Sequence, residues 1–114
     1  MTAQDYIARL RAGWPKSGDA SLEDIILADE AVRAYPQSAQ LWLMRGDLIQ
    51  LGPESCPHPL EEALASYERA VQIAPEYAQA WDEIGHYYDG VLDDVTTARR
   101  SFKEAEKLRE NHVE

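Results

Sequence analysis

The chain has 114 residues, a length typical of one domain, and 45% of them are hydrophobic. Its 21 acidic residues outnumber the 11 basic ones and give a formal net charge of −10. This charge argues against binding to nucleic acids or anionic membranes, because such contacts need Lys and Arg. It favours a basic partner, or it serves only to keep the protein in solution.

The cellular compartment is inferred from features that the sequence lacks. Cys56 is the single cysteine, so it has no partner for an internal disulfide. The first residues contain neither the basic nor the apolar segment of a secretory signal, and no apolar run is long enough to cross a bilayer. We therefore expect one cytoplasmic domain over residues 1–114.

The first two helices are predicted at each side of a loop. Residues 3–12 carry apolar side chains at helical spacing, and the segment 13–20 is rich in Gly and Pro. Trp14 in this loop either closes the end of the core or forms a contact surface. Ser21 is a typical N-cap residue and predicts a second helix, which Pro36 ends.

The remaining chain predicts four more helices and no strand. Ser38 caps the third helix, and the segment 52–59, with three prolines and a glycine, is a loop. Asp93 or Asp94 caps the last helix, which runs through Leu108. The fourth and fifth helices are expected between Leu60 and Pro75 and over residues 77–89. The fold class is therefore all-α with six helices.

An internal repeat organises this pattern, because several residue types recur 39 positions later. The recurring pairs are Pro36 and Pro75, Ala39-Gln40 and Ala78-Gln79, Trp42 and Trp81, and Gly46 and Gly85. These residues resemble the tetratricopeptide repeat family, whose pattern is Trp-x₂-Leu-Gly-x₂-Tyr, then Ala-x₃-Phe, Ala and Pro over about 34 residues. The last unit adds Ala98, Phe102 and Ala105 to the match, and the middle unit adds Ala63, Tyr67 and Ala70.

The resemblance implies a right-handed helical-hairpin solenoid of about three units. The units span approximately residues 3–36, 38–75 and 77–111, and the first is degenerate because it lacks the tryptophan and the glycine. One departure is Arg45, which stands where the family usually has a buried leucine. Either its stem extends to solvent, or Met44 and Leu48 replace the leucine through a slight rotation of the helix.

The resemblance also implies a concave groove, lined by the first helix of each unit, that binds a peptide or helix. The positions that carry over are Gln40, Leu43, Met44, Asp47 and Gln50 in the middle unit and Gln79, Asp82, Glu83, His86 and Asp89 in the last unit. Some family members bind the carboxylate of a chaperone tail with Lys, Arg and Asn, and that set is absent here. The acids predict a basic or mixed basic-apolar ligand, or else they form only a solvated face.

The sequence allows two other functions, metal binding and self-association. Glu83 and His86 have an E-x-x-H spacing that occurs in metal-binding helical bundles, but only one copy is present, so we expect no metal or cofactor. The basic residues of the last helix either cap the array or pair with the acidic groove of a second copy. We expect a non-catalytic protein-interaction module, a monomer or weak homodimer, that binds neither nucleic acid nor a membrane.

Overall fold

The computed structural model describes residues 1–111, which form six α-helices and no strand, as the sequence predicts. The helices are α1 (Ala3–Ala12), α2 (Leu22–Ala34), α3 (Ala39–Gln50), α4 (Glu61–Ile73), α5 (Ala78–Gly90) and α6 (Val95–Asn111). The expected last helix, through Leu108, thus continues by one more turn. No helix in the described part of the chain is long and apolar enough to cross a membrane.

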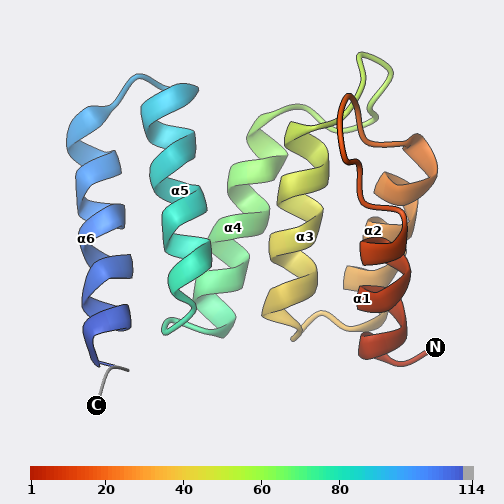
Figure 1. Ribbon diagram of the computed structural model, residues 1–114, viewed down its shortest axis with the longest axis horizontal. Coiled ribbons are helices and arrows are strands. Elements are labelled where there is room, and N and C mark those ends of the chain that lie inside the picture. Colours follow the sequence, from red (N-terminus) through yellow and green to blue (C-terminus); the bar gives the residue numbers. More distant parts are fainter. Residues whose placement is uncertain (112–114) are drawn as a thin grey trace.

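Along the longest dimension of the molecule, which measures 36 Å, α3, α4, α5 and α6 follow one another in chain order, and α1 and α2 overlap at the end next to α3 (Figure 1). Each helix packs on the next one in the sequence, and α1 also packs on α3. The N-terminus lies at one end of this row and α6 at the other (Figure 1).

Side-chain caps start four of the six helices, three of them at residues that the sequence predicts. The hydroxyls of Ser21 and Ser38 accept hydrogen bonds from the third backbone N–H that follows each. Asp94, one of the two predicted candidates, accepts from the N–H of Thr97 at 3.1 Å and from its hydroxyl at 2.6 Å. Thr2 and Asp5 form a reciprocal capping box for α1, which the sequence analysis did not identify.

The buried residues form two clusters that share α3. One face of α3 contributes Leu41, Met44 and Leu48 to a cluster with α1 and α2. Another face contributes Leu43 and Ile49 to a cluster with α4 and α5. Because α3 buries side chains on both sides, it connects the two halves of the core.

The two repeat glycines hold the same place in their helix pairs. A Cβ built on Gly46 would lie 2.5 Å from the ring of Tyr67 on α4, and one built on Gly85 would lie 2.6 Å from the ring of Phe102 on α6. Both distances are far below a normal carbon–carbon contact, so only glycine allows the aromatic ring to rest on the helix.

The two repeat tryptophans also make equivalent contacts. The indole N–H of Trp42 donates to the carbonyl of Pro36 at 3.0 Å, and that of Trp81 donates to the carbonyl of Pro75 at 2.8 Å. Each bond ties the start of one helix pair to the proline that ends the preceding helix. The middle and last units therefore repeat in their contacts as well as in their sequence.

The side chain of Arg45 does not extend to solvent, which was one of the two sequence-based alternatives, but is buried beside the core residues Met44 and Leu48. It is 8% exposed, and its Nε donates to Asp29 of α2 at 2.9 Å. Its Nη1 donates to Ser66 of α4 at 2.6 Å, and Glu62 lies 3.5 Å away. A buried arginine is tolerated where its donors are paired in this way, and here it joins three helices.

Candidate functional site

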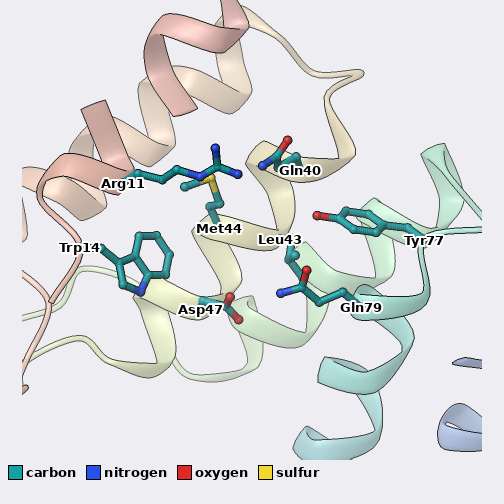
Figure 2. Close-up of a pocket in the computed structure, with 8 residues that line it drawn as sticks. All are labelled: Arg11, Trp14, Gln40, Leu43, Met44, Asp47, Tyr77 and Gln79. Atoms are coloured by element: carbon teal, nitrogen blue, oxygen red, sulfur yellow. The ribbon is translucent and has the colours of Figure 1, made fainter. Parts of the chain in front are cut away.

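One face of α3 forms the floor of a pocket of about 320 Å³ between the α1 end of the molecule and α5 (Figure 2). The spacing of three and four residues places four α3 side chains on that face. The pocket is lined by Gln40, Leu43, Met44 and Asp47 of α3, by Tyr77 and Gln79 at the start of α5, and by Arg11 and Trp14. It therefore collects side chains from all three predicted units.

Trp14 reaches this pocket because its loop is fixed at both ends. Its backbone N–H donates to Arg11 in the last turn of α1, and its side chain packs against the first core cluster. At the other end of the loop, the N–H of Ala20 donates to the carbonyl of Leu51 at 2.7 Å. Trp14 thus covers the core, which is one of the two roles considered from the sequence, and it also lines the pocket.

A second pocket of about 270 Å³ adjoins the first, and Trp14 and Asp47 line both. Its other lining residues are Gln50, Leu51 and Glu83. We refer to the two adjoining pockets together as the α3 groove. Its second part places an indole and two carboxyl groups around one space, a combination suited to a cationic side chain.

Asp47 is the most perturbed acid of the groove. Burial, with the nearby Glu83 adding to it, raises the pKa of Asp47 from 3.8 to about 7, although a hydrogen bond from Tyr67 opposes the shift. The Tyr67 hydroxyl donates to Asp47 at 2.6 Å and accepts from the Gln50 amide, also at 2.6 Å. Burial and the adjacent Asp47 raise the pKa of Tyr67 as well. A negative charge on Glu83 therefore makes the ionisation of Asp47 less favourable.

The α3 groove brings together seven of the ten residues predicted for it. These are Gln40, Leu43, Met44, Asp47, Gln50, Gln79 and Glu83. Leu43 and Met44 are only 3% and 7% exposed, so they form the floor and do not project into the opening.

The other three predicted residues lie outside the groove. Asp82 forms a salt bridge with Arg109 of α6, so this basic residue of the last helix binds an acid of its own chain. The ring of His86 packs edge-on against Phe102, with the centroids 5.0 Å apart. Asp89 is exposed near the end of α5. The groove is consequently less acidic than the sequence suggested.

Sequence reasoning missed Arg11, Trp14 and Tyr77 as groove residues. The groove positions were projected from the repeat, and the first unit has no tryptophan or glycine that would set its register. Tyr77 directly precedes α5 and so lies just before the segment that was projected. Trp14 alone carried a signal, as a large aromatic residue in a polar loop.

The metal hypothesis rested on Glu83 and His86, and the structure places them against different helices. Glu83 acts on Asp47 of α3, whereas His86 packs on Phe102 of α6. Within residues 1–111, no three His, Cys, Asp or Glu side chains gather in a way that could hold a metal ion.

In comparisons with known proteins, no family model matches the sequence and no curated protein matches it significantly.

Proposed function

We propose that the chain is a tetratricopeptide-like array of three helical hairpins that winds as a right-handed solenoid. The equivalent contacts of the middle and last units support this proposal. Gly46 and Gly85 each accept an aromatic ring from the following helix, and each repeat tryptophan donates to a proline carbonyl. The order of packing, each helix on its neighbour in the sequence, is also that of a repeat array.

The function we propose is the binding of a segment of another protein along the α3 groove. The observation that carries this proposal is the convergence of side chains from three successive units on one groove with an apolar floor. Gln40 and Gln79 supply amides that can both donate to and accept from a peptide backbone. Trp14 supplies an aromatic wall, a residue type enriched at binding hot spots.

The chemistry of the groove favours a ligand with a basic residue next to apolar ones. A Lys or Arg side chain in the second pocket would lie between Asp47, Glu83 and the indole of Trp14. Its positive charge would offset the repulsion between the two carboxyl groups. Arg11 lines only the first pocket, so an acceptor of the ligand, such as a backbone carbonyl or carboxylate, fits there.

A peptide-display selection against the purified protein tests this function. Peptides recovered on the wild-type protein should be enriched in Lys or Arg flanked by apolar residues. Glu83→Lys should weaken their binding by at least about tenfold, because it replaces an attraction with a repulsion at the basic subsite. The affinities can be measured by calorimetry or by fluorescence polarisation.

Asp89→Lys is the matched control, since it makes the same charge change on the same helix outside the groove. It should change affinity by less than about twofold, because an exposed charge at a distance is screened by salt. Equal losses in the two variants would point to non-specific charge attraction and contradict a site in the groove. Selection of no peptide that depends on Glu83 would also count against the proposal.

A further inference from the structure

Two further pockets lie on the faces of α3 and α5 that point away from the α3 groove. They are lined by residues that correspond to each other in the repeat. The middle pocket, of about 290 Å³, includes Asp29, Val32, Trp42, Arg45 and Glu62. The end pocket, of about 320 Å³, includes Glu68, Val71, Trp81, Ile84 and Thr97. Residues of α2 and α3 correspond to those of α4 and α5 at the repeat distance of 39 positions.

Residues of α4 likewise correspond to residues of α6, and the aromatic residue that packs on each repeat glycine sets the correspondence. Tyr67 and Phe102 each rest on the glycine of their helix pair, so the residues just before them, Ser66 and Ser101, are equivalent. Both serines are buried, at 0% and 6% exposure. The two pockets are thus built from matching positions of three helices each.

The wall of the middle pocket shows what such a set of groups binds, because the guanidinium of Arg45 lies among them. Asp29 accepts from Nε at 2.9 Å, and Ser66 accepts from Nη1 at 2.6 Å. The guanidinium carbon lies 5.7 Å from the centre of the Trp42 ring, within the range of a cation–π contact. An acid, a hydroxyl and an indole therefore form an arginine site inside the chain.

The end pocket keeps the three binding groups but lacks the arginine. Glu68 corresponds to Asp29, Ser101 to Ser66 and Trp81 to Trp42, whereas Ile84 stands in the place of Arg45. Among the ion pairs of residues 1–111, none includes Glu68. Isoleucine is shorter and carries no donor, so the acid, the hydroxyl and the indole line an open pocket there.

We propose that the end pocket is a docking site for an arginine side chain of a partner protein. The guanidinium would lie on the Trp81 ring with its donors on Glu68 and Ser101, as that of Arg45 does on the equivalent groups. The arginine stem would pack on Val71 and Ile84. Arginine fits better than lysine, because its planar fork can bond the acid and the hydroxyl while it stacks on the indole.

This second site is independent of the α3 groove. Trp81 and Ile84 are three residues apart and so share one face of α5, which lines the end pocket. Glu83 is one or two residues from each of them and so points away from that face, toward the α3 groove. A partner could therefore bind one site while the other stays open, and the two can be tested separately. The net charge of −10 favours a cationic ligand at either.

The test is an NMR titration of the ¹⁵N-labelled protein with the blocked peptide acetyl-Ala-Leu-Arg-Leu-Ala-amide. Three indole N–H signals report separately, Trp14 on the groove, Trp42 on the middle pocket, where Arg45 already occupies the acid and the hydroxyl, and Trp81 on the end pocket. The Trp81 signal should shift and saturate, while the Trp42 signal stays in place. Replacing arginine by citrulline, a neutral isostere, should weaken the Trp81 titration by at least about fivefold, since a charge-assisted bond is lost.

Glu68→Gln should weaken the Trp81 titration by a similar factor and leave the Trp14 signal as in the wild type. Glu68 is exposed, so this variant keeps the fold. Glu83→Lys should leave the Trp81 titration intact even where it abolishes binding in the groove, which separates the two proposals. A Trp81 signal that does not saturate, or that responds equally to the citrulline peptide or in Glu68→Gln, overturns the assignment.

Discussion

At the scale of single residues, folding favours the protonated form of Asp47, whereas the proposed binding of a basic ligand favours its ionised form. Its raised pKa means that the folded protein holds a proton more tightly than the unfolded chain does. The contribution of Asp47 to folded-state stability is therefore fully present below about pH 4 and is lost as the pH rises toward about 7, where Asp47 ionises. A basic ligand prefers the ionised form, so its binding should strengthen over the upper part of this range.

Asp47→Asn tests this conflict, because asparagine resembles the protonated acid in shape and can still accept from Tyr67. Near pH 3, where Asp47 is protonated in both the folded and the unfolded state, the free energy of unfolding should match that of the wild type. Near pH 8, the variant should be more stable by about 4 kcal/mol, since the wild type then carries a buried charge beside Glu83. Urea unfolding at several pH values measures the difference, and a constant difference across the range would contradict the raised pKa.

The residues of the candidate groove could be predicted from the sequence only where the repeat set their register. Gln40 and Gln79 were found because each follows a repeated alanine before a repeated tryptophan. Asp82 is predicted at the groove by the repeat, but it pairs with Arg109 of another helix, a tertiary contact of which the sequence gives no sign. The position of Trp14 does not follow from the sequence either, since it depends on how a loop closes against Leu51.

At the scale of helices, the close approach of the two helices in a pair depends on glycine. Gly85→Ala should destabilise the protein by about 1–3 kcal/mol, because a methyl group would overlap the ring of Phe102. This cost outweighs the gain in helix propensity, which is about 1 kcal/mol for alanine over glycine. Thermal or urea unfolding gives the change in the free energy of unfolding.

Gly90 at the end of α5 provides the control, because no atom lies within 4 Å of a Cβ built there. Gly90→Ala should leave stability unchanged or raise it by up to about 1 kcal/mol. If both substitutions had the same effect, the ring of Phe102 would not be what requires glycine at position 85.

The ends of the helices were predicted from local chemistry, whereas the charged network on Arg45 was not. Serine caps and prolines act within a few residues of one another, so the sequence alone reveals them. Arg45 bonds Asp29 and Ser66 only through tertiary contacts, and His58 bonds the other carboxylate oxygen of Asp29 at 2.7 Å. The loop 52–59 lengthens the middle unit and places His58 beside Asp29.

At the scale of the whole molecule, the order of the helices makes the free energy of local opening differ from one helix to another. The number and type of the helices could be predicted from apolar periodicity and from the Gly and Pro residues that end helices, because these are local signals. The division of the core into two clusters could not, because it depends on which faces of α3 meet which neighbours. Since α3 takes part in both clusters, its opening requires both to separate, whereas α6 packs chiefly on α5 alone.

Native-state hydrogen exchange should therefore show a gradient along the row. Amide protons in the middle of α3 should exchange only through global unfolding, and those in the middle of α6 should be protected by about 2 kcal/mol less, because a terminal helix can open without its neighbours. Leu48→Ala, at a fully buried site of α3, should lower the protection of α3 and leave that of α6 nearly unchanged, since α6 already exchanges through its own local opening. Equal protection of α3 and α6 would instead mean that the chain unfolds as one cooperative unit, and nearest-neighbour packing would then not describe its stability.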